Sequence, residues 1–120
     1  MRTVEFTIDY KITARDSLNS IYSSVHWAKR KSYADTIHWI VWQALNKAKI
    51  PREPFDGPVE IEFIFPPDKI DIDNHGYFCK SCVDAMKGWI IPNDNRKYVH
   101  GITQRFGERE DILVSIKQTK

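Results

Sequence analysis

Four stretches of the chain alternate between apolar and polar residues, and two longer stretches place apolar residues three and four positions apart. Residues 4–12, 59–65, 98–103 and 112–116 alternate, and a period of two predicts strands that bury one face. Residues 27–48 and 75–88 have the helical spacing; Pro51 stops the first helix, and Gly88 suits the end of the second. The predicted order is strand, helix, strand, helix, strand, strand. That order favours an α+β fold in which two main helices pack on a small mixed sheet.

The segments around the first helix carry two further expectations. Residues 13–20 are polar and lack a period, which predicts an exposed loop. Within the helix, Trp39 and Trp42 lie off the main apolar stripe, so the apolar face is broader than one sheet needs. We expect that face to contact a partner subunit.

The composition suits one small, ordered domain that covers residues 1–120. Hydrophobic residues make up 42% of the 120, which is enough for one modest core. No apolar run reaches membrane-spanning length, and Glu5 interrupts the apolar run that a signal peptide would need. We therefore expect a cytoplasmic protein without a membrane partner.

Cys79 and Cys82 have the spacing of half a zinc site or of a thiol redox motif. His75 would supply a third ligand on the same helical face. The sequence has no second cysteine pair, so packing in the core is the favoured interpretation.

The net charge of +2 is small, but the charges are unevenly distributed. Lys29, Arg30 and Lys31 are adjacent, and Arg96 and Lys97 form a second basic group. Between them, aspartates are concentrated in residues 68–73. Short basic clusters are often ordinary solvated faces, and these gain meaning only if the acidic segment performs chemistry.

The acidic segment lies between a predicted strand and a predicted helix. In an extended chain, residues two apart point to the same side, so Asp71 and Asp73 project together. A hard cation such as Mg2+ would relieve their repulsion by taking oxygen ligands. Asp94 lies in the turn before the next strand and would complete a three-carboxylate site if the two turns converge. The alternative interpretation is structural: Asp73 or Asn74 caps the helix, and Asp94 occupies an ordinary turn.

Three motifs resemble the core signature of RusA-type Holliday junction resolvases: Asp71-Ile-Asp73-Asn74, Val83-Asp84-Ala85-Met86 and Ile91-Pro92-Asn93-Asp94. Residues 18–22 and 26–30 are also similar to the amino-terminal loop and helix start of prophage RusA-like proteins. The similar segments extend from about residue 17 to residue 99. The resemblance implies a compact α+β fold, a homodimer and branched DNA as substrate. It also implies Mg2+ as the cofactor, with Mn2+ able to substitute, and no small-molecule cofactor.

The resemblance implies roles for individual residues as well. Asp71, Asp73 and Asp94 match the catalytic, metal-binding acids of the family. Lys80 matches its catalytic lysine if residues 75–78 include a short insertion that bulges from the helix start. Asn93 replaces one of two adjacent acids usual in the family. The residues expected to follow the DNA backbone are Asn19, Lys29, Arg30, Lys31, Arg96 and Lys97.

Together, these features predict a Mg2+-dependent endonuclease that resolves Holliday junctions or related branched DNA by paired phosphodiester hydrolysis. A two-fold dimer would supply one site for each of the two symmetry-related strands. Two alternatives stay open. One is a non-catalytic DNA-binding or structural protein with the same fold, and the other is a nuclease that acts on flaps or forks.

Overall fold

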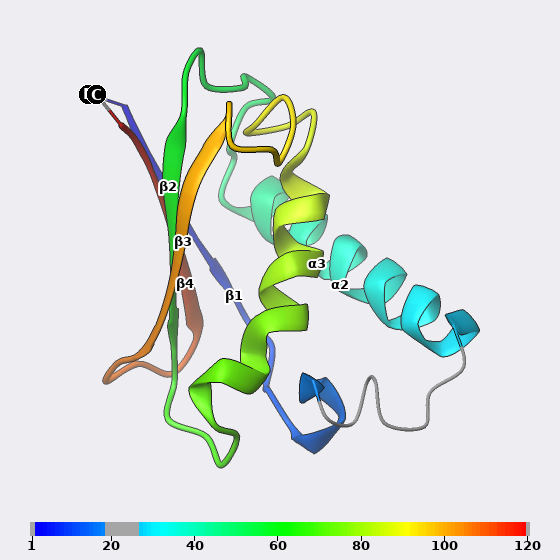
Figure 1. The fold of residues 1–120 in the computed structure, drawn as a ribbon. Helices are drawn as coiled ribbons and strands as arrows, with labels where there is room; N and C mark the ends of the chain where they lie inside the picture. The colour runs from blue at the N-terminus through cyan, green and yellow to red at the C-terminus, as the bar shows by residue number, and fades with distance from the viewer. Residues whose placement is uncertain (1, 19–26, 120) are drawn as a thin grey trace.

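The elements of the folded chain follow the order that the sequence predicts (Figure 1). The structure is a computed structural model that describes residues 2–18 and 27–119. Its strands are β1 (Thr3–Ile8), β2 (Val59–Phe65), β3 (Val99–Phe106) and β4 (Ile112–Gln118). Its helices are the 3-10 helices η1 (Ala14–Asp16) and η2 (Ile72–His75) and the α-helices α2 (Trp27–Lys47) and α3 (Gly76–Met86). The predicted α+β class, with two main helices and a mixed sheet, is confirmed.

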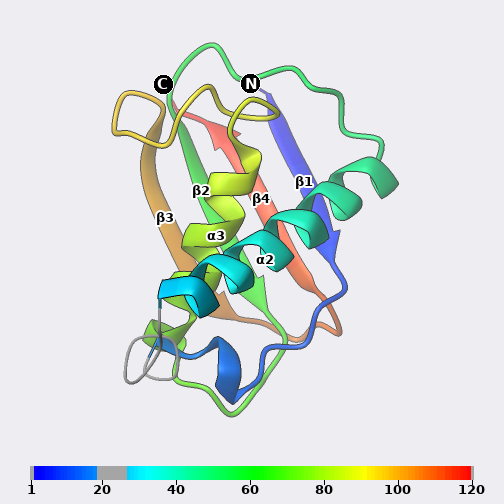
Figure 2. The ribbon, with the colours of Figure 1, turned by 90° about the vertical axis from the view of Figure 1, so that its right-hand side faces the viewer.

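The four strands form one sheet in the order β1-β4-β2-β3. β4 pairs antiparallel with both β1 and β2, whereas β2 and β3 pair in parallel. Helices α2 and α3 both cover the same face of this sheet (Figure 2). β1 is shorter than predicted because its neighbour β4 begins at Ile112, opposite Ile8, so the chain beyond Ile8 has no strand to pair with there.

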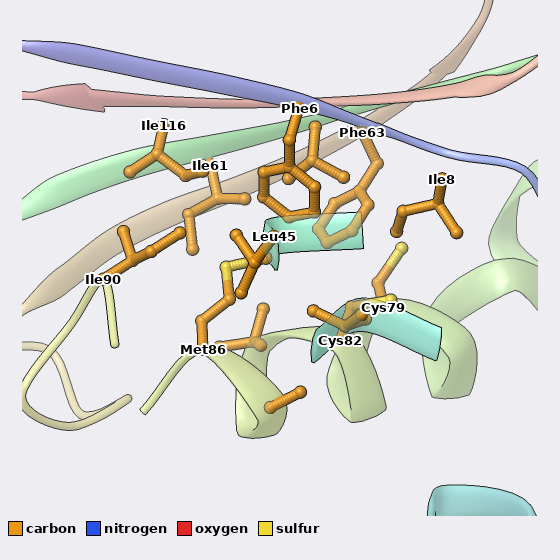
Figure 3. Close-up of a cluster of buried hydrophobic side chains, with 14 of the residues drawn as sticks. Phe6, Ile8, Leu45, Ile61, Phe63, Cys79, Cys82, Met86, Ile90 and Ile116 are labelled. Atoms are coloured by element: carbon orange, nitrogen blue, oxygen red, sulfur yellow. The ribbon is translucent and has the colours of Figure 1, made fainter. Parts of the chain in front are cut away.

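The core lies between the sheet and the two helices (Figure 3). Alternate strand residues point inward, and α2 and α3 each contribute one apolar stripe. The side chains that meet there include Phe6, Ile8, Leu45, Ile61, Phe63, Cys79, Cys82, Met86, Ile90 and Ile116. Both cysteines are free thiols within this core, and burial raises the pKa of each thiol above its ordinary value. Their positions match the expectation of core packing.

The segment before residue 18 departs from the predicted exposed loop. Asp16 is only 1% exposed, and Ser17 is also buried. The Asp16 carboxylate accepts hydrogen bonds from the hydroxyls of Tyr10 and Tyr33, each at 2.6 Å, and from the backbone N–H of Thr13 at 2.9 Å. These donors compensate the carboxylate for its lost hydration, so Asp16 is buried, whereas Ala14 and Arg15 before it are exposed as predicted.

The two tryptophans of α2 have different surroundings. Trp39 is 60% exposed, and Trp42 is 40% exposed with its indole N–H donating to the Ala85 carbonyl at 2.9 Å. Trp42 therefore links α2 to the end of α3, and a partner subunit over this face stays a prediction. In the described ranges, no helix combines the length and apolarity that a membrane crossing requires.

Candidate active site

Asp71 and Asp73 lie where the chain leaves the sheet after β2. Asp71 occupies the N-cap position of η2, and Asp73 lies within that short helix. Both residues are exposed. Across residues 2–18 and 27–119, neither carboxylate makes a hydrogen bond or an ion pair, so two free acids face solvent at this end of the sheet.

A buried histidine holds the backbone of this acidic loop. The His75 ring is fully buried and lies between the rings of Phe65 and Phe106, with centroid distances of 4.4 and 5.5 Å. Its Nδ1 is 3.0 Å from the Asp71 carbonyl oxygen, and its Nε2 is 2.9 Å from an oxygen of the Asp68 carboxylate. The loop that carries Asp71 is therefore attached to the core at a defined point.

Asp94 lies at the opposite end of the sheet. It is in the loop between α3 and β3, and β3 runs parallel to β2. In a parallel pair, the loop before one strand and the loop after the other are at different ends, as Figure 1 shows for the loops that flank α3. The 11 residues of α3 make the helix about 16 Å long. The expected convergence of Asp71, Asp73 and Asp94 within one chain is therefore wrong.

Asp94 instead belongs to a charged cluster near the C-terminal end of α3. Lys87 Nζ is 3.3 Å from an Asp94 oxygen and 3.4 Å from an Asp84 oxygen. The other Asp84 oxygen is 3.1 Å from Lys80 Nζ. Lys80, Asp84, Lys87 and Asp94 thus alternate in charge around one point, which we call the Asp84–Asp94 cluster.

The pKa values of this cluster follow from its geometry. The hydrogen bond to Asp84 raises the pKa of Lys80, and that effect exceeds the lowering caused by partial burial. Partial burial would raise the pKa of Asp84, but Lys80 and Lys87 outweigh it and lower that pKa. Partial burial would likewise lower the pKa of Lys87, yet Asp94 and Asp84 raise it. These shifts favour the charged forms of Lys80, Asp84 and Lys87.

The position of Lys80 depends on the short insertion expected within residues 75–78, at the start of α3. η2 ends at His75 and α3 begins at Gly76, so the helical path continues without a bulge. Lys80 lies seven residues after Asp73, about 10 Å further along the helix, and its charge is paired with Asp84. The structure places Lys80 with Asp94 and not with Asp71 and Asp73.

These charged residues share one side of α3. Tyr77, Lys80 and Asp84 recur at spacings of three and four on one face of α3. Asp73 in η2 precedes this row, and Lys87 at the C-cap of α3 follows it. Lys80 and Lys87 are exposed, and Asp84 is half-buried. We call this row the polar face of α3. Sequence reasoning missed Asp84 as a site residue, although its spacing from Lys80 and Lys87 was the available signal.

Two contacts show that α2 and α3 run in the same direction. The rings of Tyr33 and Tyr77 are 5.7 Å apart near the start of both helices, and Trp42 donates to Ala85 near their ends. The first turn of α2 therefore lies toward the Asp71–Asp73 end of α3.

The predicted DNA-contacting residues consequently fall into two groups. Lys29, Arg30 and Lys31 are in the first turns of α2, where Lys31 pairs with Asp35 at 2.8 Å. Arg96 and Lys97 are exposed in the loop that carries Asp94, and Lys97 Nζ lies 5.4 Å from the centroid of the Tyr98 ring. Asn19 falls outside the described residues. Each end of α3 therefore has one aspartate pair and one basic group in the same part of the fold.

No model of a known protein family matches the sequence, and no curated protein matches it either. The resemblance to RusA-type resolvases therefore depends on the motif residues themselves.

The described aspartates offer a metal ion two carboxylates at a time. They do not form the expected site of three aspartates. Among the described residues, no group of three or more Asp, Glu, His or Cys side chains lies together as a metal site. Mg2+ commonly takes one or two protein carboxylates and completes its shell with water and substrate phosphate. Asp71 with Asp73 meets that smaller requirement, and both carboxylates lack a cationic partner among the described residues.

Proposed function

We propose that this protein is a Mg2+-dependent endonuclease of the RusA type that cuts branched DNA and acts as a homodimer in the cytoplasm. Asp71 and Asp73 would hold the metal ion. Lys80 and Lys87, which Asp84 and Asp94 hold in place, would contact the substrate backbone at the other end of α3. Four-way junctions are the first substrate to test.

The observation that carries this proposal is the polar face of α3, which begins beside two free carboxylates and ends at the Asp84–Asp94 cluster. Asp71 at the N-cap of η2 and Asp73 within η2 are exposed, and among the described residues neither carboxylate has a cationic partner. A divalent cation would supply that partner. The motif resemblance supports the same two residues.

The surrounding charges are suited to a polyanion. Lys29 and Lys31 lie toward one end of α3, and Arg96 and Lys97 lie in the loop at the other end. Basic side chains at both ends of α3 favour contact with phosphates, which does not depend on the base sequence. A bound metal would supply a more acidic water and stabilise charge on the leaving oxygen. The basic groups would orient the DNA arms.

Cleavage of a synthetic four-way junction tests the proposal. With Mg2+, the purified protein should nick two opposing strands symmetrically, and a chelator should abolish the nicks. Asp71→Asn and Asp73→Asn should still bind the junction, and cleavage should fall by about 100-fold or more, beyond the usual effect of losing an outer-shell partner. Glu5→Gln is the matched control, because Glu5 is exposed on β1 and its strand neighbours Val4 and Phe6 point into the core.

Three results would redirect the proposal. Junction binding without cleavage in either Mg2+ or Mn2+ would favour a non-catalytic DNA-binding protein. Preferential cutting of flaps or forks over four-way junctions at matched salt would retain the nuclease and change the substrate. Equal cutting by Asp71→Asn and the unaltered protein would exclude the Asp71–Asp73 pair as the metal site.

A further inference from the structure

We propose that Asp68 and His75 are positioning residues that fix the orientation of the Asp71–Asp73 pair for cation binding. This inference depends on the proposed function, because it concerns the metal-binding end of the site. Neither residue belongs to the motif that carries the resemblance. Within residues 2–18 and 27–119, neither carboxylate of the Asp71–Asp73 pair makes a hydrogen bond or an ion pair that would orient it.

The contacts form a closed path from the core to the acidic loop. His75 Nδ1 is 3.0 Å from the Asp71 carbonyl oxygen, and His75 Nε2 is 2.9 Å from Asp68 Oδ2. The second oxygen of Asp68, Oδ1, accepts a hydrogen bond from the Ile70 backbone N–H at 2.8 Å. The Asp71 carbonyl also accepts from the Asn74 N–H at 2.9 Å. Residues 68–75 are therefore tied at both ends through a single imidazole ring.

The ring itself has little freedom to move. His75 is 0% exposed, and Phe65 of β2 and Phe106 of β3 pack against it at interplanar angles of 54° and 84°. A rotation of the imidazole would drive it into one of these rings, and a close-packed interior resists such a change. The two parallel strands thus set where the Asp71 carbonyl is held.

His75 contacts one hydrogen-bonding partner through each ring nitrogen. The Asp71 carbonyl lies at Nδ1, and the Asp68 carboxylate lies at Nε2. Asparagine has nearly the same shape as aspartate, and its side-chain amide offers both an acceptor and a donor to Nε2. The asparagine variant therefore keeps the geometry while it removes the charge.

Partners of this kind commonly matter for metal sites. Groups that orient a ligand without touching the ion typically change metal affinity by about 10- to 100-fold when they are removed. Here Asp71 is held through its own backbone carbonyl, and Asp73 follows two residues later within η2. Loss of the Asp68–His75 contact would let both carboxylates move apart.

Mn2+ alone is the probe for the test, measured through paramagnetic broadening of assigned backbone amide signals. In the unaltered protein, broadening should be centred on residues 71–74. Asp68→Ala should weaken the apparent Mn2+ affinity there by about 10-fold or more, whereas Asp68→Asn should stay within about 3-fold of the unaltered protein. Glu5→Gln is the control for a change of surface charge.

The conservative variant separates positioning from charge. Equal weakening by Asp68→Asn and Asp68→Ala would mean that the negative charge of Asp68 matters and its geometry does not, and it would overturn the inference. Unchanged affinity in Asp68→Ala would overturn it as well. Amide signals of the core strands that stay unchanged in Asp68→Ala would show that the variant folds, and the asparagine variant gives a second folded comparison.

The outcomes for this inference and for the proposed function differ. If the unaltered protein binds Mn2+ at residues 71–74 and cuts no DNA, the nuclease proposal fails and the positioning role stands. If it cuts junctions and Asp68→Ala binds Mn2+ normally, the positioning role fails alone. If no broadening occurs at residues 71–74, the positioning inference is wrong together with the Asp71–Asp73 metal site.

Discussion

Replacing Asp16 by alanine should destabilise the protein strongly. The carboxylate is 1% exposed and accepts hydrogen bonds from the hydroxyls of Tyr10 and Tyr33 and from the Thr13 backbone N–H. Tyr10 belongs to the segment after β1, and Tyr33 belongs to α2. The one carboxylate therefore joins two parts of the fold that are distant in sequence.

The magnitude follows from these three contacts. A hydrogen bond to a charged group contributes about 1.5–3 kcal/mol, so three contribute roughly 5–9 kcal/mol before costs. The desolvation of the carboxylate, which the alanine variant escapes, offsets several kcal/mol. We expect Asp16→Ala to lower the free energy of unfolding by about 3–5 kcal/mol. Tyr33→Phe removes one donor and should cost about 1–2 kcal/mol.

Urea unfolding followed by tryptophan fluorescence measures both changes. Asp35→Ala is the matched control, because Asp35 is an exposed acid on α2 whose ion pair with Lys31 contributes at most about 1 kcal/mol. The double variant Asp16→Ala with Tyr33→Phe should cost less than the sum of the single variants, because the two residues share one contact. A loss below about 1 kcal/mol for Asp16→Ala would refute the account of Asp16 as a satisfied buried acid.

Three further predictions concern pH, backbone strain and the separation of the aspartates. Burial and the hydrogen bond to Asp16 raise the pKa of Tyr33, so the unfolded chain loses the phenol proton at a lower pH than the folded protein does. The free energy of unfolding should therefore fall above about pH 10, by up to about 1.4 kcal/mol per pH unit. Urea unfolding at several pH values measures this slope, which should be smaller in Tyr33→Phe. Gly88 has φ 80° and open space around it, so Gly88→Ala should cost about 1–2 kcal/mol in thermal unfolding, whereas Lys49→Gly at φ 58° should be neutral or stabilising. In Mn2+ titrations, the effects of Asp71→Asn and Asp94→Asn on the apparent Mn2+ affinity should add, because the two residues lie at opposite ends of α3 and share no partner among the described residues. Strong non-additivity would indicate one common site.

The spacing of apolar residues was sufficient to predict the strands and main helices, because buried side chains recur every second residue in a strand and every three or four residues in a helix. Val4, Phe6 and Ile8 are buried on β1, and Ile37, Val41 and Leu45 are buried on α2, as the spacing predicts. The prediction failed for Asp16, where burial depends on donors from distant residues. No local pattern reports that Tyr33 will supply a hydroxyl 17 positions later.

The sequence identified individual candidate residues, but it did not predict how the fold places them relative to one another. Asp71 and Asp73 were identified from the spacing of an extended segment, whereas Asp73 lies in the 3-10 helix η2 and Asp71 at its N-cap, so the argument from strand alternation does not apply to them. Both acids are exposed. Placing Asp94 beside them required the direction of β3 relative to β2, which strand periodicity does not contain. The His75 anchor was also missed, because its two partners, Asp68 and the Asp71 carbonyl, are on the preceding loop and one of them is backbone.

The parallel pairing of β2 and β3 also limits what one chain can contact at one phosphodiester. The rise along a DNA strand is about 3.4 Å per nucleotide, so the length of α3, about 16 Å, corresponds to roughly four to five nucleotides. A single phosphate can therefore meet one end of the polar face of α3 and not both. On the proposed function, the Asp71–Asp73 end would engage the phosphate that is cut, and the Asp84–Asp94 end would meet a second phosphate. A second phosphate at that distance is available on the same strand of a linear duplex and on a neighbouring strand of a crossover, and cleavage of junction and linear duplex at matched salt separates the two arrangements.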